Sequence, residues 1–159
     1  MSHVARIALL SLACLTVFAQ DFDFASYSER TFGEVIDAHA QDFSVDADFA
    51  INVAISAIPF KYKSKVRFSR VLREIPQERL AVIKGWGASL QQPADFVESY
   101  RREFLVDDDG MEIWLPMQEQ ILPFMGNELA AGDEFYVYYV VAGKYQNQWI
   151  FLGTEFQTQ

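Results

Sequence analysis

The chain has 159 residues, and its 22 acidic and 13 basic side chains give a net charge of −9 at pH 7. This length suits one domain, and a hydrophobic content of 51% is ample for a core. A chain with this net negative charge repels polyanions, which argues against nucleic acid as a partner. The one cysteine, Cys14, rules out an internal disulfide and a multi-thiolate metal site.

The first residues of the chain predict a cleaved signal peptide, residues 1–19. Arg6 precedes an apolar run from Ile7 to Phe18, and Ala19 ends a tripeptide that a signal peptidase accepts. The run is too short to span a bilayer comfortably, because a spanning helix needs about 20 apolar residues. We therefore expect a periplasmic or secreted domain, residues 20–159, without cysteine or transmembrane segment. The alternatives are an uncleaved anchor helix and lipid attachment at Cys14, although the residues before Cys14 fit a lipobox poorly.

A helix is predicted from about Phe32 to Gln41. Thr31 and Glu34 have the spacing of a capping box, in which a hydroxyl and a carboxylate each satisfy a backbone amide. The apolar residues that follow recur every three or four positions, which is typical of a helix with one buried face. An acidic loop comes next, with Asp42, Asp46 and Asp48.

The stretch from Phe49 to Val71 alternates with a period of two, which indicates strands. Pro59 divides it into two runs, and a bend or a sheet edge is expected there because proline cannot donate a ladder hydrogen bond. The two runs form either one long bent strand or a hairpin. Four cations of the second run share one face of the strand, and we call them the basic stripe: Lys61, Lys63, Lys65 and Arg67.

Two short helices are predicted after the basic stripe. Pro76 begins the first, which should end near Lys84 because Gly85 and Gly87 favour a helix end. Pro93 begins the second helix.

The last third of the chain predicts two strand pairs. Asp109-Gly110 is a common turn dipeptide between two strand-like runs and indicates a hairpin. The runs 134–141 and 149–156 are apolar on both faces, so this pair should be covered on both sides. The segment 117–122 fits no element firmly. The order of elements predicts an α+β fold, with a mainly antiparallel, small barrel-like sheet and two or three short helices.

His39 and Asp37, with Asp42, Asp46 and Asp48, form the one cluster in the mature domain that combines a histidine with carboxylates. Such a group could bind a divalent metal, or its histidine could act as a general base oriented by an acid. The spacing matches no specific metal motif, and His39 falls on the apolar face of the predicted helix. A histidine at the edge of the core is therefore the simpler interpretation.

Other signals for chemistry are weak. The acidic run 107–112 has oxygen ligands of the kind that calcium prefers, but an acidic hairpin turn accounts for it. The chain shows no nucleophile elbow and no histidine-rich zinc helix. Catalysis is therefore not favoured, and neither a cofactor nor a metal is predicted.

The basic stripe has several interpretations. It is either the solvent face of an edge strand, on which lysines oppose sheet pairing, or a surface that recognises an anion together with the aromatic Tyr62. Acidic residues of the chain itself could also pair with it. The leading hypothesis is an exported, non-enzymatic domain that binds an envelope ligand or a protein partner through Lys61, Tyr62, Lys63, Lys65 and Arg67. The alternatives are a hydrolase-type or metal-assisted enzyme that uses His39 with nearby aspartates, and a structural envelope component. The hypothesis names no ligand and no oligomeric state.

Overall fold

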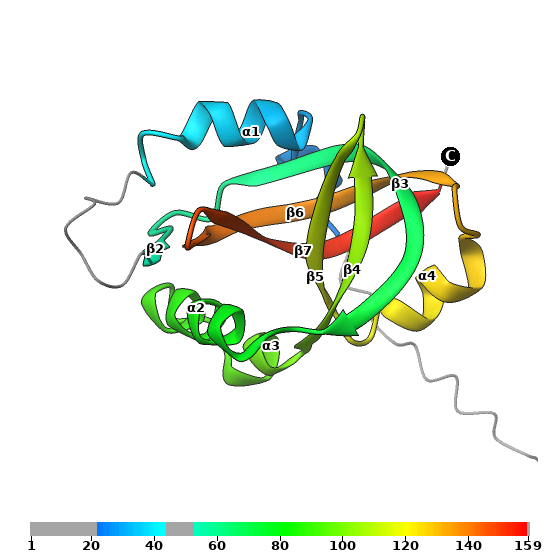
Figure 1. Ribbon diagram of the computed structural model, residues 1–159. Coiled ribbons are helices and arrows are strands. Elements are labelled where there is room, and N and C mark those ends of the chain that lie inside the picture. Colours follow the sequence, from blue (N-terminus) through cyan, green and yellow to red (C-terminus); the bar gives the residue numbers. More distant parts are fainter. Residues whose placement is uncertain (1–21, 44–52, 159) are drawn as a thin grey trace, which may run out of the picture.

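The computed structural model describes residues 22–43 and 53–158 (Figure 1). The expected leader, and the start of the strand expected from Phe49, lie outside these residues. The helical elements are a 3-10 turn η1 (Phe24–Ser26), α1 (Phe32–His39), α2 (Gln77–Ser89), α3 (Ala94–Glu98) and α4 (Leu122–Glu128). The strands are β1 (Ser28–Glu29), β2 (Val53–Ile55), β3 (Lys61–Glu74), β4 (Tyr100–Asp108), β5 (Met111–Gln118), β6 (Glu134–Tyr145) and β7 (Gln148–Thr158).

Five strands close into a barrel. β3 pairs antiparallel with both β4 and β6, while β4–β5 and β6–β7 are antiparallel hairpins. The ring closes where β5 runs parallel to β7, at Met117 and Gly153. The ring order β3-β4-β5-β7-β6 is that of a five-stranded Greek-key barrel of the OB type. The expected α+β fold with a barrel-like sheet is thus confirmed, although the sheet is mixed, since β1 also joins β3 in parallel.

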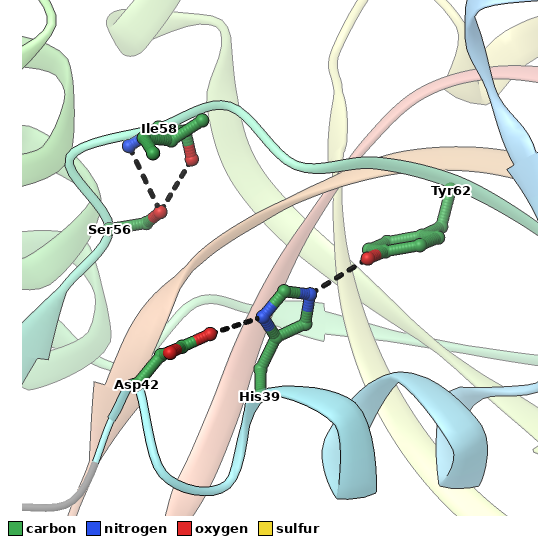
Figure 2. Close-up of polar contacts among 5 residues, drawn as sticks. All are labelled: His39, Asp42, Ser56, Ile58 and Tyr62. Atoms are coloured by element: carbon green, nitrogen blue, oxygen red, sulfur yellow. Dashed lines mark hydrogen bonds and ion pairs between the residues drawn. The ribbon is translucent and has the colours of Figure 1, made fainter.

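The stretch around Pro59 is not a hairpin but two successive strands that run in the same direction along β6, with a bend between them. β2 and β3 both run antiparallel to β6, β2 at Gly143–Tyr145 and β3 at Glu134–Val140. Between them the backbone N–H of Ser56 donates to the carbonyl of Ala142, and its hydroxyl donates to the carbonyl of Ile58 (Figure 2). The bend expected at Pro59 is therefore present, and Ser56 holds it.

The β6–β7 hairpin is covered on both faces, as its sequence predicts. Phe151 and Tyr139 lie inside the barrel, where α1 and α4 contribute Phe32 and Met125 to the same core. Figure 1 shows these two helices on opposite sides of the barrel. On the outer face, α2 packs against residues that include Val140, Ala142, Ile150 and Leu152.

The predicted helices are present, but one boundary was wrong. α1 has the full capping box, in which the N–H of Glu34 donates to Thr31 and the N–H of Thr31 donates to Glu34. α2 continues past Lys84 through both glycines to Ser89. A Cβ at Gly87 would overlap Val97, and one at Gly85 would lie 2.9 Å from Cδ1 of Ile55. The glycines therefore allow close packing against α3 and β2 and do not end the helix.

The segment that the sequence left unassigned divides between two elements. Its first residues complete β5, and its last residue, Leu122, begins α4.

Among the described residues, no helix combines the length and the apolar character needed to cross a bilayer.

Candidate functional site

The basic stripe lies on the outside of the barrel, on a strand with neighbours on both sides. Ser64, Val66 and Phe68 alternate with the cations and are buried. From Lys61 to Arg67 the strand pairs with β6, and on its other side Tyr62 and Lys63 pair with β1. The interpretation of the stripe as the protected face of an edge strand was therefore wrong.

Three of the four cations are paired with carboxylates from three other strands. Lys63 Nζ lies 3.0 Å from Oε2 of Glu29, and Lys65 Nζ lies 2.7 Å from Oε2 of Glu134. Arg67 Nη1 lies 3.6 Å from Oδ1 of Asp107. The hydrogen bonds with Glu29 and Glu134 raise the pKa of Lys63 and Lys65, and both carboxyl pKa values are lowered in return. Most of the stripe's positive charge is therefore compensated within the chain.

Lys61 is different. Among the described residues, no carboxylate oxygen lies within 4.0 Å of its Nζ. The ammonium donates a long hydrogen bond of 3.4 Å to the hydroxyl of Ser26 and lies 5.5 Å from the centre of the Tyr27 ring. Its side chain is exposed, so the first cation of the stripe keeps a charge that an external group can reach.

Tyr62 does not share the surface of the stripe. Its hydroxyl lies 2.8 Å from Nε2 of His39, on the other side of β3 (Figure 2). The period-two pattern already placed Tyr62 on the face opposite the cations, so the sequence itself argued against including Tyr62 in the binding surface. The aromatic rings beside the stripe are Tyr27 at Lys61 and Tyr136 at Lys63, the second with a distance of 4.9 Å from Nζ to ring centre.

His39 lies in a chain of contacts that uses both of its ring nitrogens. Nδ1 lies 2.9 Å from Oδ2 of Asp42, and Nε2 contacts Tyr62 (Figure 2). The residue is only 6% exposed, and the Phe60 ring packs at a centroid distance of 4.2 Å. Asp37 is exposed and is not one of the two hydrogen-bond partners of the His39 ring, while Asp46 and Asp48 lie outside the described residues. No group of three or more potential ligands among the described residues is placed to hold a metal ion.

An aromatic cluster covers the outer face of β6 next to Lys61. It consists of Phe22, Phe24 and Tyr27, whose rings lie 5.6, 5.0 and 5.4 Å from the ring of Tyr138. The hydroxyl of Tyr27 lies 3.1 Å from that of Thr154 on β7 and so attaches this N-terminal segment to the barrel. Tyr138 is 2% exposed as a result.

A pocket of about 440 Å³ opens between this N-terminal segment, the outer face of the barrel and helices α2 and α3. We call it the Lys61 pocket. Its lining is mainly apolar, and Lys61 is the cation in it. The residues that line it are Phe22, Tyr27, Pro59, Lys61, Trp86, Gln92, Phe96, Gln118, Val140 and Thr154.

A second pocket, of about 420 Å³, lies at the other end of the stripe and has the opposite character. Lys65 and Arg67 line it together with Arg30, but so do six carboxylates: Glu29, Glu34, Asp107, Asp108, Asp109 and Glu134. Burial, together with the neighbouring acids, raises the pKa of Asp108 even though its carboxylate accepts a hydrogen bond of 2.6 Å from the N–H of Phe32. An anion is therefore disfavoured at this end of the stripe.

On geometry, the Lys61 pocket is the candidate functional site. It brings Lys61, a cation without a carboxylate partner in the part of the chain that the structure describes, to aromatic walls, and its volume lies in the range of small-molecule sites, roughly 300–1,000 Å³. Comparisons of the chain with protein-family models, with curated proteins and with solved structures found no match. The site could not be identified from the sequence, because its walls come from segments that are far apart along the chain.

Proposed function

We propose that the chain is an exported, non-enzymatic domain that binds an envelope ligand through the Lys61 end of the basic stripe. The observation that carries this proposal is the Lys61 pocket, in which one exposed cation borders a mainly apolar hollow. The rest of the stripe supports binding less well, because Glu29, Glu134 and Asp107 already pair with its cations. Export remains an expectation from the leader-like residues 1–19.

Binding is favoured over hydrolysis by the environment of the histidine. A general base needs a ring nitrogen that reaches a substrate proton. Both nitrogens of His39 already have partners in the chain, Asp42 and Tyr62. Histidine and carboxylate, the groups that most often act as acids and bases, are also missing from the described residues that line the pocket.

The proposal is tested with an extract of the cell envelope of the producing organism. The purified protein is incubated with the extract, recovered and denatured, and the released small molecules are identified by mass spectrometry. We expect a molecule that the wild type and Lys65→Gln retain, that Lys61→Gln loses, and that is released chemically unchanged. Lys65→Gln is the matched control, since it removes a cation from the same strand face but outside the pocket.

Two results would overturn the proposal. Equal retention by Lys61→Gln would remove the pocket as the binding site. A molecule that the wild type converts into another species would indicate an enzyme instead.

A further inference from the structure

The charge around the Lys61 pocket limits the kind of ligand that it accepts. Of the described residues that form its wall, Lys61 carries the one positive charge and none carries a carboxylate. Burial raises the pKa of Tyr27 in this wall, and the negative charges of Asp23 and Glu155 add to that shift. Lys61 can balance a head group with one negative charge, whereas the further charges of a polyanion would find no second cation among the described lining residues.

The position of Lys61 places that head group at the rim of the pocket. Its ammonium lies at the start of β3, just after the bend at Pro59, and is bound only weakly by Ser26. An anionic oxygen that accepted a hydrogen bond from this ammonium would replace a long hydrogen bond to a neutral hydroxyl with an ion pair, in which donor and acceptor both carry charge.

The interior of the pocket favours an apolar body. Trp86 and Phe96, whose rings are 6.3 Å apart, come from α2 and α3, and Phe22 and Tyr27 come from the N-terminal segment. Val140 of β6 also lines it. Side chains of this type gain free energy when they exclude water together with an apolar ligand.

We infer that the Lys61 pocket binds a small monoanionic amphiphile, with a carboxylate-like head group at Lys61 and an apolar body among the aromatic side chains. This inference rests on the proposed function and names the ligand class of the same site. Polyanionic glycans are disfavoured as the ligand of this pocket, because its described lining offers them one cation.

The head group is tested with two fluorescent probes that share an apolar body. 8-Anilinonaphthalene-1-sulfonate carries one negative charge, and N-phenyl-1-naphthylamine carries none. We expect Lys61→Gln to weaken sulfonate binding by about tenfold and to change binding of the neutral probe by less than about twofold. Lys65→Gln should leave both probes unchanged. Wild-type affinity should fall with rising salt for the sulfonate alone, because salt screens the charge.

The body and the physiological class are tested by competition. Decanoate should displace the sulfonate probe, whereas decanol at the same concentration should displace much less. Phe96→Leu should weaken the binding of both probes, since it alters the apolar wall of the pocket and leaves Lys61 in place. Circular dichroism and thermal unfolding establish that each variant is folded before it is titrated.

The outcomes separate this inference from the proposed function. If Lys61→Gln weakens the binding of both probes equally, or does not weaken the binding of the sulfonate probe, the inference of a monoanionic head group is wrong. If the retained envelope molecule still depends on Lys61 in that case, binding stands and only the ligand class is wrong. If neither the probes nor the envelope molecule depends on Lys61, both proposals fail.

Discussion

The hydroxyl of Tyr62 lies 2.8 Å from Nε2 of His39, and this contact ties β3 to the last residue of α1. The other ring nitrogen contacts Asp42, so a side chain that is 6% exposed has both nitrogens satisfied. A buried polar atom that loses its partner is destabilising by about 1–3 kcal/mol. The chain of three residues therefore acts as a connection between the helix and the barrel.

Tyr62→Phe should lower the free energy of unfolding by about 1–3 kcal/mol, because Nε2 of His39 loses its partner. Urea denaturation measures the change. Tyr136→Phe is the matched control, since its hydroxyl contacts Glu29 at an exposed position and should contribute little. An unchanged unfolding midpoint in Tyr62→Phe would show that the contact is dispensable.

Glu103 lies at the centre of a buried ion cluster, and its loss should be the most damaging single charge change. It is fully buried and contacts Arg73 at 2.6 Å and Arg79 at 3.1 Å, and Arg79 is itself 5% exposed. Among the described residues, Glu103 is the one carboxylate paired with these two cations, and breaking a buried pair by Glu103→Gln is destabilising by about 3–5 kcal/mol. Chemical denaturation should show this loss and almost none for the exposed Glu112→Gln. A midpoint equal to that of the wild type would contradict it.

Phe151→Ala should destabilise the domain by about 3–5 kcal/mol, because this side chain is fully buried inside the barrel. Trp149→Ala should be less damaging, since Trp149 is partly exposed at the end of the hairpin. Thermal and urea unfolding of both variants tests this order. Phe124→Ala is the control, because Phe124 is 60% exposed. Cooperative unfolding of Phe151→Ala at the wild-type midpoint would mean that the hairpin is peripheral.

Two helical glycines should respond to alanine in opposite directions. Gly126 in α4 has open space where a Cβ would lie, so Gly126→Ala should stabilise the protein by about 0.5–1 kcal/mol through helix propensity. Gly87 in α2 packs against Val97, so the added methyl group of Gly87→Ala should lower the unfolding midpoint instead. Stabilisation by Gly87→Ala would show that α3 can shift to make room.

Asp108 and Glu29 should give opposite dependences of stability on pH. Burial raises the pKa of Asp108 in the folded state, so the folded protein binds more protons and loses stability as pH rises through that pKa. Asp108→Asn cannot ionise, and its side-chain carbonyl can still accept from Phe32. Its stability relative to the wild type should therefore increase from pH 3 to pH 7.

The pKa of Glu29 is lowered by its hydrogen bond from Lys63, so its stabilising contribution is present above its ordinary pKa and is lost as pH falls. Glu29→Gln should therefore lose stability relative to the wild type at pH 7 and not at pH 3. Urea midpoints measured across this range test both signs. Parallel pH profiles for wild type and both variants would contradict the assignment.

Features that depend on a few neighbouring residues could be predicted from the sequence. Thr31 and Glu34 form their capping box within one helical turn. Asp109 and Gly110 both have positive φ, 51° and 90°, as a tight hairpin turn requires. The two-faced apolar pattern of the last hairpin correctly predicted a covered strand pair.

Features that depend on distant partners could not be predicted in this way. The alternation of the stripe correctly placed its cations on one face, but Glu29, Glu134 and Asp107 belong to three other strands. The same limitation applies to Gly87, because its role in the close packing of α2 against α3 depends on Val97 of the other helix. The Lys61 pocket combines residues from both ends of the described chain, and no local pattern marks such a set.

The pairing at Met117 and Gly153 has a consequence for the order in which the barrel folds. The β4–β5 and β6–β7 hairpins each pair strands that a short turn connects, so their contacts close short loops, whereas α2 and α3 separate β3 from β4. The ring is completed only when β5 meets β7 and β3 meets β6, across long stretches of chain. A Cβ at Gly153 would lie 2.8 Å from Cε of Met117, so a larger residue there would obstruct closure after both hairpins have formed. In amide exchange of the native protein, residues at the β5–β7 junction should therefore open before those in the centre of β6.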